Sequence, residues 1–350
     1  MTPRERQEQW ELESLAHTAA HAVRSSRERP EEPDPIRTAF QRDRDRIVHS
    51  KAFRRLKHKT QVFIDPEEDH FRTRLTHTLE VTQIARTIAR ALRLNEDLTE
   101  AIALAHDLGH SPFGHAGEEA LDAAYKSFVP SAGFRHDLQS LRVVEVLEIH
   151  GDGPGLNLTW QVRDGIAHHS KGMRDLNDPQ LSRSETLEGQ VVRIADRIAY
   201  VNHDLDDAVR AGMIRPEEVP IEPLRRLGAT HSERISTMAM DVIAFSESRD
   251  RVDMSTEIAE ATDALKHFLY ERVYREERFR NDDLLKAQRL VGDLFRFYME
   301  QPDQMPEGTW REDMDTIARA QAVCDYVAGM TDRYAVSRFE KHFVPKGLPL

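Results

Sequence analysis

The chain carries the stretch His106-Asp107-Leu108-Gly109-His110-Ser111-Pro112-Phe113-Gly114-His115-Ala116-Gly117-Glu118, which places three histidines, an aspartate and a glutamate within thirteen residues. Imidazole and carboxylate groups are costly to bury without partners, so an ordinary helix or loop does not explain this density. Glycines and a proline interrupt the stretch, which predicts that one helix ends near Gly109 and that an irregular connection follows. The stretch therefore indicates a functional site that other parts of the chain complete.

Helices on either side of this stretch supply further polar groups. A helix over 71–92 places His77 on its apolar face, and the next helix turns His106 inward at its end. A third helix, over 189–211, is strongly apolar on one side and holds Asp196 within the apolar run. A carboxylate in that setting needs an arginine or a cation as its partner.

Helical spacing accounts for most of the remaining chain, and strand signals are few. The other expected helices cover 4–26, 38–59, 98–107, 118–127, 139–147, 160–169, 231–248, 254–274, 281–300, 309–330 and 331–343, with one short strand over 156–159. We therefore predict an all-α fold. We expect an N-terminal helix and linker over 1–35, a core over 36–212, and a helical C-terminal region over 213–350 that packs on the core.

Composition narrows the class of protein. Of the 350 residues 39% are hydrophobic, and no apolar run approaches the roughly 20 residues that span a bilayer. The N-terminus has no apolar segment of the signal-peptide type, and the single cysteine, Cys324, excludes internal disulfides and cysteine-rich zinc modules. We expect a cytoplasmic protein. The net charge of −12 disfavours general nucleic-acid binding, so an anionic substrate needs a locally basic site.

The segment from Thr38 to Lys59 is such a basic region. Its cations greatly outnumber its two acids, Asp43 and Asp45. They are Arg42, Arg44, Arg46, Lys51, Arg54, Arg55, Lys57 and Lys59. Two interpretations of this segment stay open. It is either a solvated charged face or a phosphate-binding face, and the second is favoured by the paired hydrogen bonds that arginine makes to phosphate oxygens.

Two imidazoles and two carboxylates on three predicted helices make a candidate metal site. Its ligands are His77, His106, Asp107 and Asp196. Each residue alone is explained by a structural role, but the four together favour one divalent ion, and the mixed donors suit Mn, Mg, Fe, Ni or Zn. Such an ion lowers the pKa of bound water and polarises a phosphoryl oxygen.

The glycine-rich connection then supplies groups for proton transfer or phosphate contact. His110 and His115 lie just beyond the predicted ligands, and histidine titrates near neutral pH. Glu118 is placed to hold one imidazole in a single tautomer. The residues by themselves thus predict a metal-dependent phosphohydrolase.

The H…HD…D pattern of the four ligands and the longer stretch 106–118 resemble the bacterial deoxyguanosinetriphosphate triphosphohydrolase family of HD-domain enzymes. The resemblance spans about 36–212, and it is supported by the segments 50–56, 72–77, 134–140 and 194–200. It implies an all-α HD core that uses one divalent ion. It also implies hydrolysis of dGTP, or of several dNTPs, to the deoxynucleoside and inorganic triphosphate by attack at the α-phosphorus.

The same resemblance implies roles for individual residues. His77, His106, Asp107 and Asp196 hold the metal, and His115 with Glu118 forms the catalytic pair. His110 and His136 contact the phosphates or assist protonation, although part of the family has a different residue in place of His110. With Arg54 from the basic segment, the expected substrate contacts are Gln61, Arg74, His136, Arg197, Tyr200 and Asp204. Of these, Gln61 and Asp204 are expected at the sugar, and Tyr200 is expected to disfavour ribose.

Relatives of this kind are often hexamers, so a homo-oligomer is expected. The sequence leaves open whether a second, allosteric dNTP binds and whether a basic groove on an oligomer contacts single-stranded DNA. Two other interpretations stay open. One is a different HD-type nucleotide phosphohydrolase, such as a nucleotidase or a phosphodiesterase. A (p)ppGpp hydrolase of this class usually has Glu-Asp soon after the HD pair, where this chain has Gly109-His110-Ser111, and the Gly-Tyr-Pro segment that marks cyclic-dinucleotide phosphodiesterases is absent. The other is a non-catalytic nucleotide-sensing or nucleic-acid-binding HD protein, which the four intact ligands disfavour.

Overall fold

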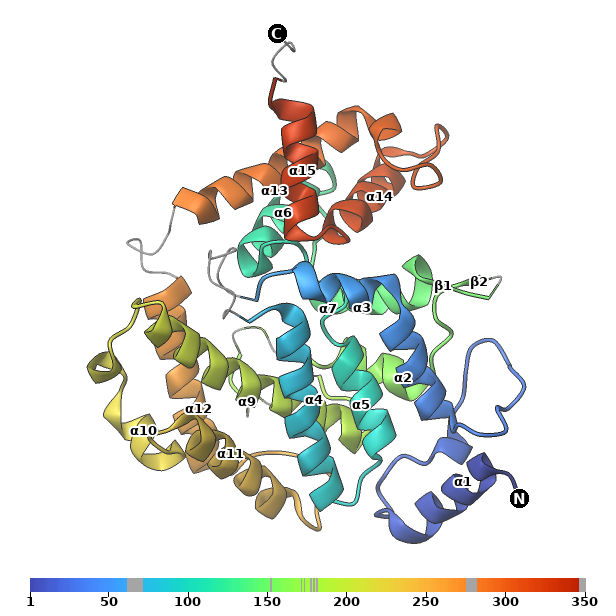
Figure 1. Cartoon of the computed structure of the whole chain (residues 1–350), viewed down its shortest axis with the longest axis vertical. Helices are drawn as coiled ribbons and strands as arrows, with labels where there is room; N and C mark the ends of the chain where they lie inside the picture. The colour runs from blue at the N-terminus through green and yellow to red at the C-terminus, as the bar shows by residue number, and fades with distance from the viewer. Residues whose placement is uncertain are drawn as a thin grey trace.

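Helices make up nearly all of the regular structure, which confirms the predicted all-α fold (Figure 1). The computed structural model describes residues 1–61, 72–151, 153–170, 172, 174–176, 178, 180, 182–274 and 282–345. Within these residues the strands form one two-stranded antiparallel sheet. In the same ranges, no helix is both long and apolar enough to cross a membrane. Residues 71 and 281, where two expected helices begin, lie outside the described ranges.

The N-terminal helix is shorter than expected. α1 (Pro3–Ser14) is followed by a 3-10 turn, η1 (Ala22–Arg24), and not by further α-helix. The Glu11 carboxylate accepts the Ala22 N–H at 2.7 Å, which folds the chain back onto α1. The continuous helix over 4–26 is therefore wrong, because this hydrogen bond stabilises a turn in its place.

The basic segment forms three short helices in place of one. They are α2 (Ala39–His49), α3 (Lys51–Arg55) and the 3-10 turn η2 (Leu56–His58). The break lies at Ser50, whose Oγ accepts the Phe53 N–H at 3.1 Å and begins a new helix. The Glu148 carboxylate accepts the backbone N–H groups of Lys51 and Ala52, so all of the first three N–H groups of α3 have side-chain partners. The single helix expected over 38–59 is wrong for this reason.

The central core lies between four helices. They are α4 (Arg74–Ala91), α5 (Glu96–Ala105), α8 (Trp160–Ala167) and α9 (Leu187–Arg210). Fully buried aliphatic side chains such as Val81, Ile102 and Ile198 fill the space between them. Gly165 lets α8 approach α5 closely, since a Cβ there would lie 2.5 Å from the Ile102 Cδ1. The ends of α4, α5 and the middle of α9 thereby meet at one place.

The helix that begins within the stretch His106–Glu118, here named the catalytic stretch for the chemistry that its sequence predicts, starts earlier than expected. α6 runs over Gly114–Phe128, whereas the sequence indicates a start at residue 118. Phe113 has a φ of 62° and Gly114 a φ of 57°, so the chain reverses direction there and can begin a helix at once. Gly117 packs against Pro112, whose carbonyl oxygen would lie only 1.8 Å from an added Cβ. His115 and Glu118 therefore share the first turn of a helix.

The region after α6 contains the only sheet in the described residues. α7 (His136–Arg142) continues into a π-helical turn, η3 (Val143–Leu147), and the strands are β1 (Ile149–His150) and β2 (Gly153–Pro154). The strand expected over 156–159 is wrong. The Asn157 carbonyl is occupied by the guanidinium groups of Arg27 and Arg46, which leaves Thr159 in a single isolated bridge.

The C-terminal helices divide between two hydrophobic clusters. The first three are α10 (Ile221–Leu227), α11 (His231–Ser246) and α12 (Thr256–Leu269), the last continuing into a π-helical turn, η5 (Tyr270–Tyr274). They pack beside α9 and extend the central core (Figure 1). The sequence did not indicate α10. Short 3-10 turns, η4 (Pro216–Glu218) and η7 (Pro302–Gln304), occur at connections.

The last three helices form a second cluster with α6. They are α13 (Asp282–Glu300), α14 (Thr316–Ala328) and α15 (Asp332–Phe343). Leu121 of α6 packs in the same cluster as Phe295 and Val323, and Figure 1 shows these helices at one end of the molecule. α14 begins later than the expected 309, because the Asp315 carboxylate caps its first turn. The helix that begins in the catalytic stretch is thus anchored by the C-terminal end of the chain.

Candidate active site

The structure brings the four expected metal ligands together. His77 comes from α4, His106 and Asp107 directly follow α5, and Asp196 lies in the middle of α9. His77 Nε2 is 3.4 Å from Asp196 Oδ1 and 3.9 Å from Asp107 Oδ2. His106 Nε2 is 3.6 Å from Asp107 Oδ1 and 3.9 Å from Asp196 Oδ1. Donor atoms at these separations can surround one small cation, since each metal–ligand bond is about 2.0–2.2 Å long.

The protonation states of these groups also fit a metal ion. His106 Nδ1 lies 2.7 Å from the Ala103 carbonyl, so this nitrogen carries the proton and Nε2 keeps its lone pair. Among the described residues, the buried Nε2 has no hydrogen-bond partner. Burial lowers the pKa of His106. Burial opposes ionisation of Asp107, but the surrounding imidazoles and Arg74 hold its pKa well below the usual range. Neutral imidazole and ionised carboxylate are the forms that bind metal.

A second group of side chains surrounds Glu118. Its Oε1 accepts the backbone N–H of His136 and lies 2.9 Å from His136 Nδ1. Its Oε2 lies 3.5 Å from His115 Nδ1 and 3.9 Å from His110 Nε2. The rings of His110 and His136 are stacked, with centroids 4.6 Å apart. One carboxylate thus faces three imidazoles.

Electrostatics separates the roles of these imidazoles. Burial opposes a charge on His136, but the Glu118 carboxylate raises the pKa of His136 to about 9. The charge on His136 in turn holds the pKa of Glu118 well below its usual range despite burial. Burial, with Arg74 and His136 nearby, lowers the pKa of His110 well below its usual value. At neutral pH the group therefore contains a His136–Glu118 ion pair and a neutral His110.

Both groups open onto one cavity of about 760 Å³. The expected site residues that line it are Gln61, Arg74, His77, Asp107, His110, His115, Glu118, His136, Asp196, Arg197 and Tyr200. Arg74 is buried and donates to Asp107 Oδ2 at 2.7 Å, so it connects the metal cluster to the cavity wall. The His115 side chain is half-exposed, which makes it the imidazole of its group that a bound molecule reaches most readily.

Two expected substrate contacts lie elsewhere. Arg54 is exposed on α3 and does not line this cavity. Asp204 is 1% exposed and lies on the inner face of α9, with its Oδ1 2.8 Å from His203 Nδ1. The structure therefore does not place either side chain where a molecule in the cavity would contact it.

The basic segment also turns away from the cavity. Arg42 and Arg46 pair with Glu31, and Arg44 lies within 3.3 Å of acids at the start of α5. These arginines are held by carboxylates of the same chain. None of the cations between residues 38 and 59 lines the cavity.

Two histidines of the site were not singled out from the sequence. His169 lines the cavity, and its ring centroid lies 5.1 Å from that of His106 and 5.5 Å from that of His136. Burial lowers the pKa of His169 to about 4. His203 lies behind His77, with 2.7 Å between His203 Nε2 and His77 Nδ1. The sequence signal for His169 was that it forms an adjacent pair with His168 directly after α8.

The wall opposite the catalytic stretch comes from α12 and the turn after it. Lys266 and Tyr270 line the cavity there. The Lys266 ammonium lies 2.6 Å from Asp175 Oδ1, and Arg197 of α9 lies 3.3 Å from Asp263. Arg197 was expected from the sequence, whereas Lys266 and Tyr270 were missed because α12 follows the stretch 106–118 by well over a hundred residues.

Two domain families match this chain. The HD domain family matches residues 74–201, which include all four candidate ligands, and the phosphohydrolase-associated domain matches residues 252–341. A deoxyguanosinetriphosphate triphosphohydrolase-like protein of Caldanaerobacter subterraneus is 55% identical over 346 residues, with 99% of this chain and 97% of the relative aligned. Proteins of the same name from Desulfatibacillum aliphaticivorans and Clostridium perfringens are 49% and 46% identical, each with 99% of both chains aligned.

These relatives are aligned over almost their whole length, so the similarity includes both the HD region and the C-terminal helices. The identity far exceeds what a shared helical fold alone requires. The chain therefore belongs to the deoxyguanosinetriphosphate triphosphohydrolase-like family of HD-domain phosphohydrolases.

Proposed function

We propose that this chain hydrolyses deoxynucleoside triphosphates, dGTP or several dNTPs, to the deoxynucleoside and inorganic triphosphate. The observation that carries the proposal is that His77, Asp107 and Asp196 of the candidate metal cluster line the same cavity as Glu118 and its three imidazoles. Its volume of about 760 Å³ lies within the range of small-molecule sites. The reaction breaks the bond between the α-phosphorus and the 5′-oxygen, and it needs a proton donor beside the leaving oxygen.

One divalent ion, held by His77, His106, Asp107 and Asp196, would polarise a phosphoryl oxygen and activate water in this site. The donor set accepts Mn, Mg, Fe, Ni or Zn. Asp107 is already in contact with Arg74, so this carboxylate is oriented before any ligand arrives. His77 and His106 are oriented in the same way through their Nδ1 atoms.

His115 is the residue we assign to proton transfer. It is half-exposed at the cavity, and Glu118 lies behind it at 3.5 Å. In the proposed reaction the 5′-oxygen of the leaving deoxynucleoside takes a proton from His115, and the attacking water supplies the oxygen that the triphosphate gains. Glu118 is held in place by His136, so it can orient the His115 imidazole for the transfer.

Cationic side chains around the cavity would compensate the charge of a triphosphate. Arg74, Arg197 and Lys266 line it from three different helices. Tyr200 lies one turn after Asp196 on α9 and also lines the cavity, so we propose that its ring packs beneath the sugar and disfavours ribose. The homo-oligomer, the allosteric dNTP and the cytoplasmic location expected from the sequence remain predictions.

Product identity tests the proposed reaction. The full chain is incubated with each of the four dNTPs and with Mn²⁺ or Mg²⁺, and the products are separated by chromatography. Deoxynucleoside plus tripolyphosphate is the expected result. A dNMP with pyrophosphate, or release of single phosphates, would show that the site catalyses another phosphohydrolase reaction.

Two substitutions separate metal binding from proton transfer. His106→Ala removes a ligand whose Nε2 points into the cluster, so both metal binding and turnover should be lost. His115→Ala leaves the cluster intact, so metal binding should persist while turnover falls by about 10²–10⁴-fold, the usual contribution of a general acid. Near-normal turnover in His115→Ala would contradict the role assigned to this histidine.

A further inference from the structure

Residues 59–61 connect the start of α4 with the catalytic stretch. The Lys59 carbonyl accepts the backbone N–H of Arg74 at 3.0 Å. The Gln61 carbonyl accepts from the Arg74 guanidinium at 3.4 Å, and it lies only 2.9 Å from the position of a Cβ added to Gly114. This three-residue segment therefore contacts both α4 and the first turn of α6.

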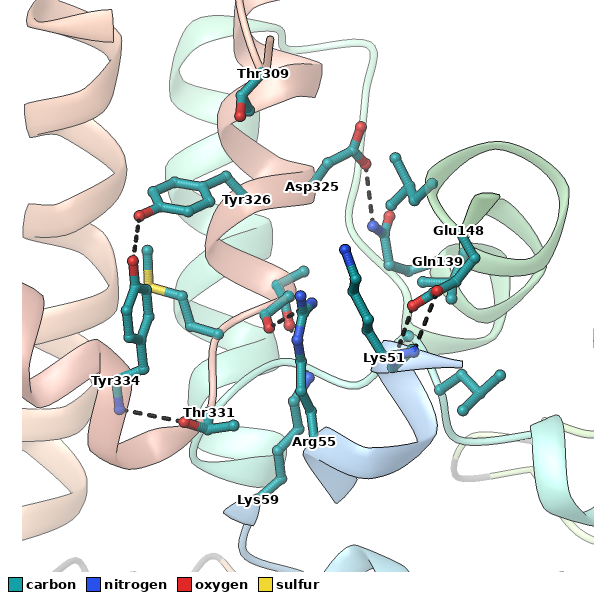
Figure 2. A pocket seen from close by; sticks show the side chains of 18 of the residues that line it. Lys51, Arg55, Lys59, Gln139, Glu148, Thr309, Asp325, Tyr326, Thr331 and Tyr334 are labelled. Atoms are coloured by element: carbon teal, nitrogen blue, oxygen red, sulfur yellow. Dashed lines mark hydrogen bonds between the residues drawn. The ribbon is translucent and has the colours of Figure 1, made fainter. Parts of the chain in front are cut away.

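The Lys59 ammonium is buried between two parts of the chain that are far apart in sequence. It donates to the carbonyl group of His110 in the catalytic stretch, and to that of Ala328 at the end of α14, the latter at 2.8 Å. The residue is 2% exposed, and within the described residues no carboxylate forms an ion pair with it. Lys59 lines a second cavity, of about 620 Å³, that shares no lining residue with the candidate active site (Figure 2).

The burial of this ammonium is costly, because a charged group loses its hydration and is here held by neutral carbonyl groups. Burial lowers the pKa of Lys59 to about 7. An apolar side chain of similar length could fill the same space, since replacing buried charges by apolar groups is often neutral or stabilising. A contribution to stability alone therefore does not explain a lysine at this position.

One acceptor of Lys59 belongs to a residue in the wall of the candidate active site. The buried His110 imidazole lines that cavity and is stacked on the imidazole of His136, with ring centroids 4.6 Å apart. His110 Nε2 lies 3.9 Å from Glu118 Oε2. The direction of the His110 side chain thus decides how this imidazole meets a molecule in the cavity.

The backbone around His110 is held by two side chains. Ser140 of α7 accepts the Gly109 N–H at 2.9 Å and donates to the His106 carbonyl at 2.6 Å. Lys59 holds the next carbonyl that matters, that of His110. The backbone has two soft dihedral angles per residue, and a hydrogen bond to the carbonyl restricts the second of them. Without the ammonium, the peptide group that follows His110 is free to rotate and to carry the side chain with it.

We propose that Lys59 is a positioning residue for the candidate active site. Its ammonium fixes the His110 carbonyl and so keeps the His110 imidazole stacked on His136, beside Glu118, in the cavity wall. The hydrogen bond to Ala328 ties this arrangement to the C-terminal helices. The kinetic consequence rests on the proposed function, whereas the effect on the backbone does not.

Hydrogen–deuterium exchange measures the effect on the backbone without any turnover. The full chain is compared with Lys59→Met, because methionine is an unbranched side chain that has no hydrogen-bond donor. We expect amide exchange in peptides that cover 108–114 to become at least about tenfold faster, the order expected when a hydrogen bond from a charged group is lost. Lys57→Met changes an exposed lysine two residues earlier, so it is the control and should exchange as the unaltered chain does.

The location of the change in exchange distinguishes two roles of Lys59. Faster exchange only at the end of α14, in 324–330, would show that Lys59 fastens that helix and does not position the catalytic stretch, which would overturn the proposal. Unchanged exchange in both places would overturn it as well. Lys59→Gln keeps a donor without the charge. If Lys59→Met does not fold, Lys59→Gln provides the same measurement, with a smaller acceleration expected in 108–114.

Steady-state kinetics separates positioning from binding. With a dNTP and Mn²⁺, kcat of Lys59→Met should fall about ten- to a hundredfold, the effect of a misplaced group in an active site, while KM stays within about twofold. Calorimetric affinity for Mn²⁺ should be unchanged, because the acceptors of Lys59 are not among the four candidate ligands.

Three kinetic or binding results would contradict this role. Kinetics like those of Lys57→Met, a raised KM with normal kcat, or weaker Mn²⁺ binding would each overturn the proposal. Absence of turnover in the unaltered chain would instead refute the proposed reaction and leave the exchange result standing.

Discussion

His203 Nε2 lies 2.7 Å from Nδ1 of His77, and Asp204 Oδ1 lies 2.8 Å from the other ring nitrogen of His203. All three side chains are buried. His77 is thus held from behind, with its Nε2 directed at the carboxylates of the candidate metal cluster. Groups that orient a metal ligand through its second nitrogen raise its basicity and fix its tautomer.

We expect His203→Ala to weaken binding of Mn²⁺ by roughly ten- to a hundredfold, the usual effect of removing such a support. The measurement is a calorimetric titration of the purified chain with the metal ion. His49→Ala, which removes an exposed histidine at the end of α2, is the control and should bind as the unaltered chain does. Equal affinities in the two variants would contradict a supporting role for His203.

Glu118→Gln should change the charge of His136. The Glu118 carboxylate raises the pKa of His136 to about 9, so this imidazole is protonated at pH 7.5 in the unaltered chain. Without that carboxylate, burial dominates and the pKa should fall below the ordinary 6.5, which leaves His136 neutral at pH 7.5. Nuclear magnetic resonance of labelled histidine follows this titration directly. A His136 that still titrates near pH 9 in the variant would show that another group supplies the charge.

Asp332→Ala should destabilise the chain and slow turnover together. Asp332 Oδ2 accepts from the N–H and the hydroxyl of Thr60, and its Oδ1 accepts from the N–H of Phe113. These hydrogen bonds connect Asp332, at the start of α15, to Thr60 and to Phe113 of the stretch 106–118. We expect a loss of at least about 2 kcal/mol in the free energy of unfolding, because buried donors are left unpaired.

Chemical denaturation and steady-state kinetics at a temperature where both chains are folded provide the measurements for Asp332→Ala. Asp313→Ala is the matched control, since Asp313 lies in an exposed turn and pairs only with Arg311 in the described residues. It should leave stability and turnover unchanged. If Asp332→Ala behaved like this control, the C-terminal cluster would not position the catalytic stretch.

Glu188→Gln should make stability less dependent on pH. Burial raises the pKa of Glu188 to about 7, although its carboxylate accepts the N–H groups of Ala20 and Asn95. Since the pKa is higher in the folded chain than the ordinary 4.5, the protonated form favours folding. This contribution is complete below pH 4.5 and is lost as the pH rises through 7, by a total on the order of 3 kcal/mol.

The difference in unfolding free energy between Glu188→Gln and the unaltered chain should therefore grow in favour of the variant from pH 4.5 to 7 and then level off. Urea denaturation at pH 5 and pH 8 measures it. Glu185→Gln, at an exposed position three residues earlier, is the control and should show no such trend. A pH-independent difference for Glu188→Gln would mean that this carboxyl is ionised in the folded chain at pH 5.

The sequence was sufficient to predict the fold class and the set of candidate ligands. The fold class followed from helical spacing, because every helix of a globular protein needs an apolar stripe, whichever element it packs against. The cluster was predictable because His77 and His106 lie on buried faces and Asp196 lies within an apolar run of the sequence, where polar groups need a common partner. Helix ends were less predictable. Ser50 and Glu11 break helices through contacts that apolar spacing does not encode.

Tertiary structure alone decided where the remaining side chains act. Asp204 lies two turns beyond Asp196 on α9, yet it contacts His203, which lies behind His77, and does not line the cavity. The arginines at the start of the basic segment pair with Glu31 and with acids of α5, and Lys51, Arg55 and Lys59 line a cavity separate from the candidate active site. Those partners lie in the irregular stretch before the basic segment or on another helix, so helical spacing within the segment does not reveal them. The stretch from His106 to Glu118 determined by itself which chemistry to expect, whereas its completion by α4, α9 and the α14–α15 corner depends on packing between distant helices, which local sequence does not specify.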